Sequence, residues 1–177
     1  MDAKIPAMRS SSPIRRRLIA GFIAALMAAP VWALDAPAGK VLLTVSGELQ
    51  QRNTADGAAF DQAMLEKLPQ RSFSTKTPWY PEPRKFTGVL LRDLLAAVGG
   101  RGKTIKAIAI NDYRVDIPVE QAQRHELMVA YLLDDKPMPV REKGPLMLMY
   151  PFDSQPELRS ALNYSRAVWQ LKALELR

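Results

Sequence analysis

The 177-residue chain contains no cysteine and only one histidine, His125. Without cysteine it has no disulfide bridge and no thiolate ligand for a metal, so a hydrophobic core has to stabilise the fold. One histidine does not build a zinc site of the usual kind, and we place His125 at the surface or at a helix end. No basic run with interleaved aromatic residues is present, so we expect no nucleic-acid partner.

The chain has one long apolar run, near its N-terminus, and this run is short for a membrane span. Arg15–Arg17 precede 12 apolar residues, Leu18–Ala29, and Pro30–Ala33 ends in small residues. A transmembrane helix needs about 20 apolar residues, whereas this order of segments is typical of a cleavable signal peptide. We expect residues 1–33 to be an export signal cut near Ala33, with an uncleaved anchor as the alternative. Residues 34–177 would then form one domain without a membrane span, in the periplasm or another exported location.

The high positive charge belongs in part to this leader. The whole chain has 25 basic and 18 acidic residues and a net charge of +7. The leader holds five of the basic residues and one of the acidic ones, which leaves 20 basic and 17 acidic residues, a net charge of +3, in residues 34–177. That charge is too small to indicate binding to nucleic acid.

Residues 41–176 alternate between period-two and helical apolar patterns, separated by short turns. The patterns predict three or four short helices, within residues 60–68, 90–98, 118–123 and 152–163. They predict seven or eight strands, over residues 41–49, 72–77, 105–110, 114–117, 127–133, 138–140, 146–150 and 167–176. This mixture favours an α+β fold with a mixed, β-rich sheet.

The stretch Ser72–Gly99 combines a predicted strand, a proline-rich loop over Pro78–Phe86 and an amphipathic helix. A loop held between a strand and a helix is a common place for a site. This one carries basic, hydroxyl and aromatic side chains: Thr75, Lys76, Thr77, Trp79, Arg84 and Lys85. Such a set suits an anionic, partly planar ligand. The alternative is a packed connector with a structural tryptophan.

A second polar turn, Asn111–Tyr113, separates two apolar strands and can direct an amide, a carboxylate and a phenol at one point. The alternative is a turn stabilised by the asparagine side chain, with Tyr113 packed sideways. Asp134 and Asp135 are adjacent acidic residues, but neighbours in a turn usually diverge, so we interpret them as turn formers.

The order of the motifs resembles that of a known family. The chain reads VLLTVSGEL, SFSTKTPW, FTGVLLRDLL, INDYRVDIP, KGPLMLMYP and SRAVWQLKALEL in sequence over Val41–Leu176. This order is similar to the molybdopterin-binding domain of the sulfite oxidase type, in particular to its small exported single-domain members. The resemblance implies a mixed, β-rich α+β domain and a molybdenum–pterin cofactor in a positively lined cleft.

One position departs from the family. The resemblance implies a cysteine ligand to molybdenum four residues before the tryptophan that matches Trp79, and that position is Thr75 here. A threonine hydroxyl is hard and stays protonated at neutral pH, so it replaces a soft thiolate poorly. A positive loop can still hold a pterin phosphate or another anion through charge and hydrogen bonds.

Three hypotheses follow. The first is an exported binding or sensory module that keeps the fold, holds molybdopterin, another pterin or a small anion, and performs no oxo transfer. The second is an active molybdenum oxidoreductase that holds the metal through the pterin dithiolene alone. The third is a structural protein with a vestigial cleft that docks a partner in the cell envelope.

We expect no catalytic residue and no metal ligand. The expected cleft consists of Thr75, Lys76, Thr77, Trp79, Arg84, Asn111, Asp112, Tyr113 and Lys143.

Overall fold

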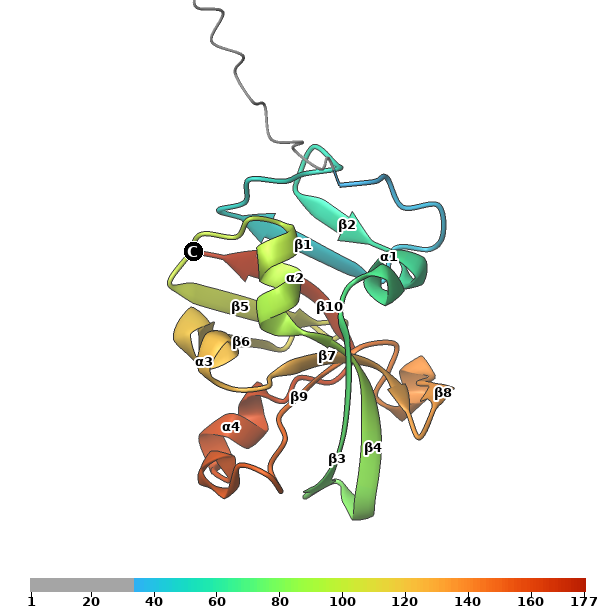
Figure 1. The fold of residues 1–177 in the computed structure, drawn as a ribbon, viewed down its shortest axis with the longest axis vertical. Helices are drawn as coiled ribbons and strands as arrows, with labels where there is room; N and C mark the ends of the chain where they lie inside the picture. The colour runs from blue at the N-terminus through green and yellow to red at the C-terminus, as the bar shows by residue number, and fades with distance from the viewer. Residues whose placement is uncertain (1–33) are drawn as a thin grey trace, which may run out of the picture. The chain divides into compact units, whose positions relative to one another are not determined.

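The computed structural model describes residues 34–177, in which two β-sheets carry the fold (Figure 1). The first sheet has the strand order β2-β1-β10-β5-β6. Its strands are β1 (Leu43–Gly47), β2 (Ala58–Phe60), β5 (Thr104–Ala109), β6 (Arg114–Pro118) and β10 (Leu171–Leu176). Only β1 and β10 pair in parallel, with Val45 opposite Leu174, while the other neighbours are antiparallel. The sheet is therefore mixed.

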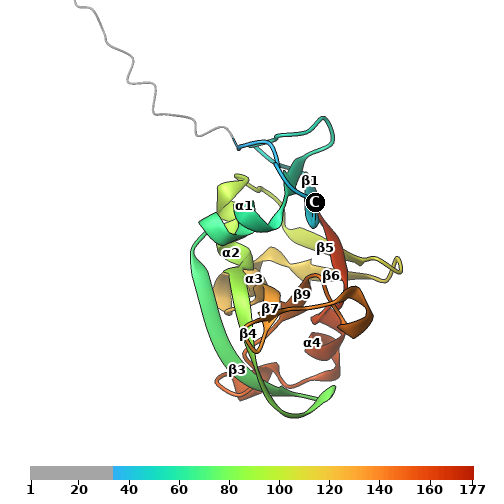
Figure 2. The same ribbon diagram turned by 90° about the vertical axis from the view of Figure 1, so that its right-hand side faces the viewer.

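The second sheet is antiparallel and has the order β3-β4-β7-β8, with β9 pairing the other part of β7. Its strands are β3 (Gln70–Thr77), β4 (Tyr80–Leu90), β7 (Met128–Leu133), β8 (Lys136–Pro137) and β9 (Met147–Met149). The long β3–β4 hairpin extends beyond β7, and its turn lies on the same side of the domain as α4 (Figures 1 and 2). This hairpin supplies one wall of the site described below.

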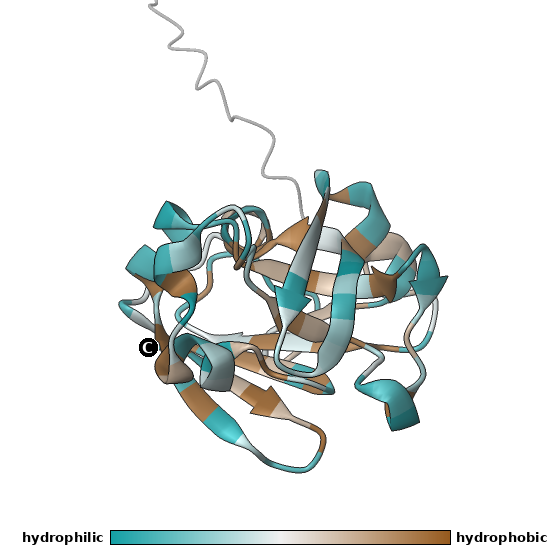
Figure 3. Ribbon diagram, turned by 90° about the horizontal axis from the view of Figure 1, so that it is seen from below, coloured by the Kyte–Doolittle hydropathy of each residue, from teal (hydrophilic) through white to brown (hydrophobic). Residues whose placement is uncertain are grey.

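Short helices connect the strands. They are α1 (Gln62–Lys67), α2 (Leu91–Ala97), α3 (Val119–Arg124) and α4 (Ala161–Arg166), with 3-10 turns at Val140–Glu142 and Pro156–Leu158. Helix α2 buries Leu91, Leu94 and Leu95 against the core, as the apolar spacing predicts. The hydropathy view shows hydrophobic segments on several strands, whereas other strands are largely hydrophilic (Figure 3). No helix within residues 34–177 is long and apolar enough to cross a membrane.

The predicted fold class, a mixed β-rich α+β domain, is confirmed. The predicted loop Pro78–Phe86 is wrong, because β4 begins at Tyr80 and its residues pair with β3 as far as the Thr77–Tyr80 pair. Prolines are compatible with this because the Tyr80–Arg84 part of β4 has β3 on one side only. The predicted strand over residues 138–140 is also wrong: the strand β8 ends at Pro137. The predicted signal peptide lies outside the described residues.

Two smaller expectations are confirmed. His125 ends α3 as its C-cap residue, and its Nδ1 atom lies 2.6 Å from the Gln155 side-chain oxygen. Asp134 and Asp135 form the β7–β8 turn, both with positive φ, and their carboxylates pair with Arg84 and Lys85 of β4. Burial raises the pKa of Asp134, but the hydrogen bonds from Lys85 N and from Arg84 outweigh burial and lower it overall.

Glycine is required in the middle of β4. A Cβ atom on Gly88 would lie 2.1 Å from the carbonyl oxygen of Val129 in β7. The β4–β7 register shifts between Thr87 and Gly88, so the two backbones approach each other at a bulge. The glycine in the middle of this strand therefore marks a close contact between strands rather than a turn.

Asp61 stabilises the start of α1 and holds the preceding segment. One carboxylate oxygen accepts a hydrogen bond from Met64 N (2.9 Å), and the other accepts hydrogen bonds from Ala38 N (2.9 Å) and Gly39 N (2.7 Å). The side chain is buried. The bond from Gly39 N is the main cause of a lowered Asp61 pKa, helped by those from Met64 and Ala38 and opposed by burial.

We predict that Asp61→Asn lowers the urea midpoint at pH 7, because an amide bonds the three N–H groups less strongly than a carboxylate. Since folding lowers the Asp61 pKa, its contribution is present above the unfolded value of about 3.9 and is lost as pH falls through the folded value. The difference in midpoint between wild type and variant should therefore narrow below about pH 4. A difference that stays constant between pH 7 and pH 2.5 would contradict this account.

Candidate functional site

Thr75 lies near the end of β3 and is completely buried. Its hydroxyl oxygen accepts a hydrogen bond from Asp153 N at 3.1 Å and lies 3.3 Å from the carbonyl oxygen of Lys76, to which it donates. Both hydrogen-bonding capacities of the hydroxyl face backbone groups. The side chain therefore joins β3 to the segment after β9 and presents no free oxygen to a ligand.

Asp153 completes this junction from the other side. One of its carboxylate oxygens accepts a hydrogen bond from Lys76 N (2.8 Å), and the other accepts one from the Arg159 guanidinium (2.6 Å). Arg159 is also anchored by its Nε, which donates to the carbonyl oxygen of Phe152 at 2.9 Å. Around these groups is an open hollow of about 490 Å³, which we call the Asp153 hollow, lined by Lys76, Thr77, Asp153, Arg159 and Tyr164.

Beside this hollow, three aromatic rings meet at the tip of the β3–β4 hairpin. Trp79 lies edge-on to Trp169, with ring centroids 5.2 Å apart and planes at 88°, and edge-on to Tyr164, at 6.0 Å and 85°. Tyr164 contacts Phe152 in turn, at 4.8 Å. The edge-on geometry is one that aromatic pairs favour. It fastens the hairpin to α4 and to the segment before β10.

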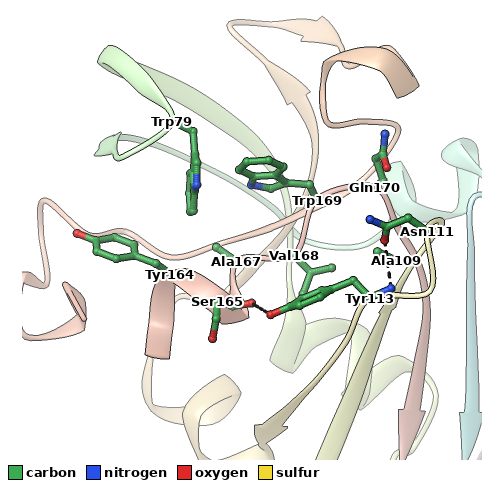
Figure 4. A pocket seen from close by; sticks show the side chains of 10 residues that line it. All are labelled: Trp79, Ala109, Asn111, Tyr113, Tyr164, Ser165, Ala167, Val168, Trp169 and Gln170. Atoms are coloured by element: carbon green, nitrogen blue, oxygen red, sulfur yellow. Dashed lines mark hydrogen bonds between the residues drawn. The ribbon is translucent and has the colours of Figure 1, made fainter. Parts of the chain in front are cut away.

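These rings line a second cavity of about 250 Å³, the aromatic pocket, which Figure 4 shows. Tyr113 lies at its base and donates a hydrogen bond from its hydroxyl to the carbonyl oxygen of Ser165 at 2.9 Å. Asn111 accepts a hydrogen bond from Tyr113 N at 3.1 Å, which is the expected asparagine turn. The lining contains aromatic, small and neutral polar residues but no charged one: Trp79, Ala109, Asn111, Tyr113, Tyr164, Ser165, Ala167, Val168, Trp169 and Gln170. Tyr164 lines both cavities, so they adjoin.

Gln170 holds the pocket's segments together. It has a positive φ of 51°, and its N–H donates to Lys143 O at 2.9 Å. Its carbonyl oxygen accepts from Ile110 N at 2.8 Å, and its side-chain amide donates to Val140 O at 2.7 Å. A left-handed conformation is unfavourable for glutamine, so these three bonds have to maintain it.

Two of the predicted basic residues, Lys143 and Arg84, do not line the pocket. The Lys143 ammonium lies 4.8 Å from the Trp169 ring centroid and 4.9 Å from that of Tyr80. The Arg84 guanidinium lies 5.0 Å from the Tyr80 ring and pairs with Asp134. Burial of the Tyr80 phenol is the main cause of its raised pKa, so the ring stays neutral beside these cations at physiological pH.

The structure brings some of the nine predicted residues together and separates others. Trp79, Asn111 and Tyr113 line the aromatic pocket, and Lys76 and Thr77 line the Asp153 hollow. Thr75 is buried and hydrogen-bonded to Asp153 N, and Lys143 contacts the ring of Trp169 without lining the pocket itself. Arg84 and Asp112 are directed elsewhere: Arg84 pairs with Asp134, and Asp112 pairs with Lys172 at 2.8 Å. That hydrogen bond from Lys172 is the main cause of the lowered Asp112 pKa.

Sequence reasoning missed the partners of Trp79. The predicted helix within residues 152–163 stops before Tyr164, which lies in α4. The predicted strand over residues 167–176 contains Trp169, but β10 begins at Leu171 and leaves Trp169 in the preceding segment. The sequence patterns associate neither Asp153 nor Arg159 with Thr75. The signal available in the sequence is the residue type alone, because tryptophan and tyrosine combine a large apolar ring with a polar group and are enriched at interfaces. No sequence pattern, however, links residue 79 to residues 164 and 169.

A buried polar network supports this side of the domain from below. The Tyr150 hydroxyl donates to the Gln121 side-chain oxygen at 3.0 Å, and Arg166 donates to the same oxygen at 3.1 Å. The buried Asn163 side chain donates to Leu158 O at 3.0 Å. Burial is the main cause of a strongly raised Tyr150 pKa, so its phenol remains a donor. The network links α3, the residue that follows β9 and α4, the helix that carries Tyr164.

A model of the oxidoreductase molybdopterin binding domain family matches residues 48–153 of the chain. The matched segment is more than half of the chain, and the chain belongs to this family. Its members typically bind molybdopterin. Thr75 and Trp79 lie inside the matched segment and Asp153 at its end, whereas Arg159, Tyr164 and Trp169 lie beyond it. No curated protein matches the chain.

The residues present do not fit a protein-bound molybdenum centre. Thr75, which the resemblance matches to the metal-binding cysteine, has a buried hydroxyl that is hydrogen-bonded to backbone groups on both sides. The chain has no cysteine at all. Within residues 34–177, no three histidine, aspartate or glutamate side chains are arranged to hold a metal ion.

We predict that Thr75→Val lowers the free energy of unfolding by about 1–3 kcal/mol, because valine preserves the shape but leaves the buried Asp153 N–H without its acceptor. Thr75→Ser keeps the hydroxyl and is the matched control, which should lose clearly less. Urea denaturation followed by circular dichroism measures both. Equal stability of the valine variant and the wild type would contradict the structural role assigned to this hydroxyl.

Proposed function

We propose that this chain is an exported binding module of the molybdopterin-binding family that holds a planar, pterin-like ligand carrying an anionic group and performs no molybdenum oxo transfer. The observation that carries the proposal is the state of Thr75. Its hydroxyl stands where the resemblance implies a sulfur donor. It accepts a hydrogen bond from Asp153 N and donates one to Lys76 O. What remains accessible nearby is suited to binding rather than to metal chemistry.

The aromatic pocket supports a flat ligand. Trp79, Tyr164 and Trp169 come from different segments and present ring faces and edges to the same cavity. A heterocycle placed there can stack on a ring and exchange hydrogen bonds with neutral neighbours such as Asn111. The absence of charged residues from the lining favours a ring that is itself uncharged.

The neighbouring hollow supports an anionic group on the same ligand. It contains the Lys76 backbone N–H and the Arg159 guanidinium, and Lys76 also contributes its ammonium. Because Tyr164 borders both cavities, a ring in the pocket can extend a phosphate toward these donors. Charge-assisted hydrogen bonds of this kind are the stronger class.

A second candidate function is docking of an envelope protein. Four large apolar residues that are at least one third exposed lie around Gln170: Ile110, Tyr113, Val140 and Trp169. Exposed apolar groups gathered at one place favour a contact surface. Under this alternative, Trp169→Ala and Val140→Ser would abolish capture of the partner, while substitutions in the Asp153 hollow would not affect it.

Both tryptophans of residues 34–177 line the aromatic pocket, so selectively excited tryptophan fluorescence reports on this site. We predict saturable quenching of the 34–177 domain by a phosphorylated pterin. Trp79→Ala should weaken binding at least tenfold, about 1.4 kcal/mol or more, through loss of stacking. Tyr131→Phe, outside both cavities, is the control and should bind like wild type. Circular dichroism should first establish that each variant is folded.

The absence of oxo-transfer chemistry is tested separately. Protein purified from its own host should carry molybdenum far below one atom per chain when measured by mass spectrometry of the metal. Near-stoichiometric molybdenum with a visible absorption band would overturn the proposal and favour ligation through the dithiolene alone. If pterins do not quench the fluorescence and denaturation releases no bound small molecule, the docking function is the better account.

A further inference from the structure

The Asp153 carboxylate is held in the way that a protein holds an external oxyanion. One oxygen accepts from a backbone N–H, that of Lys76 at 2.8 Å, and the other accepts from a guanidinium, that of Arg159 at 2.6 Å. Backbone N–H groups and arginine are the donors that recognise phosphate, sulfate and carboxylate. The geometry points to an oxyanion-binding site in the Asp153 hollow that the chain's own carboxylate occupies and keeps closed.

The donors do not depend on Asp153 for their positions. Lys76 lies in β3 at a register shift, and its two neighbours Thr75 and Thr77 both pair with β4 and so hold the Lys76 N–H in place. The Arg159 Nε donates to Phe152 O at 2.9 Å, so the guanidinium keeps one anchor if the carboxylate leaves. The Asp153 N–H bonded to Thr75 is a backbone group, so a change of the Asp153 side chain preserves the junction with β3. The site is therefore preformed.

The carboxylate is also displaceable. The Asp153 side chain is 31% exposed and that of Arg159 is 46% exposed. Ion pairs open to solvent in this way are weak. A dianionic phosphate or sulfate brings more charge than the carboxylate, and the Lys76 side chain lines the same hollow. An incoming oxyanion would take the two donors, and Asp153 would turn toward solvent.

Asp153 would thus act as a selectivity device for the ligand class proposed above, and this part rests on that proposed function. A free oxyanion has to compete with a tethered carboxylate at high effective concentration and binds poorly. An oxyanion attached to a ring in the aromatic pocket gains the stacking energy as well, and displaces the carboxylate. The chain would reject inorganic anions and accept ring-bearing ones.

The test measures binding of sodium sulfate and of sodium phosphate at constant ionic strength, with the Lys76 and residue-153 amide signals in ¹H–¹⁵N spectra as the reporter. The protein is the 34–177 domain in three forms: wild type, Asp153→Ala, and Asp112→Ala as control. The control removes the same charge from a different exposed ion pair, that with Lys172. Acetate, as a monoanionic carboxylate, is a further arm that separates dianions from any carboxylate.

We expect Asp153→Ala to bind sulfate or phosphate saturably and at least tenfold more tightly than wild type, with the Lys76 amide shifting most. Asp112→Ala should behave like wild type, and adding Arg159→Gln to Asp153→Ala should abolish the gain. If Asp153→Ala is poorly folded, Asp153→Ser serves instead and should give the same gain. Equal, non-saturable shifts in wild type and in the folded variant would overturn the inference.

The two proposals fail in different ways. If wild type binds phosphorylated pterin but Asp153→Ala binds inorganic anions no better than wild type, the closed oxyanion site is wrong and ring binding stands. If Asp153→Ala gains sulfate affinity but no pterin quenches either tryptophan, the oxyanion site stands and the ring-binding function is wrong.

Discussion

The junction between Thr75 and Asp153 is the contact on which the rest of this site depends. The buried threonine hydroxyl accepts the Asp153 N–H, and the Asp153 carboxylate returns to accept the Lys76 N–H. These reciprocal bonds close the end of β3 against the segment that follows β9. They leave no unsatisfied donor or acceptor at the one position where a metal ligand is expected, and they bring Arg159 to the edge of the same hollow. Thr75, which the resemblance matches to the sulfur donor, thus has a neighbour, Asp153, whose backbone N–H bonds to the threonine hydroxyl.

Around this junction the family scaffold is kept while the accessible chemistry differs. The β3–β4 hairpin of the second sheet carries Trp79, whose ring packs edge-on against Tyr164 of α4 and against Trp169. The result is an aromatic pocket without charge, beside a hollow whose charges are largely paired with one another. The proposed ligand would bind there by stacking and by a few directed hydrogen bonds. The chain has no cysteine that could supply a thiolate to molybdenum.

Much of the fold was predictable from local patterns, whereas the site was predictable only in part. Alternation identified the strands around Val45, Ile105 and Leu174, and helical spacing identified α2, because both periods reflect which face is buried. The hairpin at Tyr80 was mistaken for a loop, since prolines suggest a break and strand pairing on one side only is invisible in sequence. Trp79 was singled out by its setting among basic and hydroxyl residues. Its partner Trp169 was not, because it is 90 residues away.

The sequence by itself determined the family, the fold class and the loss of the thiolate, because these depend on the order of motifs and on the identity of one residue, Thr75. Only the tertiary structure decided what that threonine does and what surrounds it. The hydrogen bonds to Asp153 and the ring contacts of Trp79 join segments from β3 and from the end of the chain. Contacts between such distant segments are set by how the two sheets and α4 pack. Apolar periodicity shows which face of an element is buried, but not which distant residue it will contact.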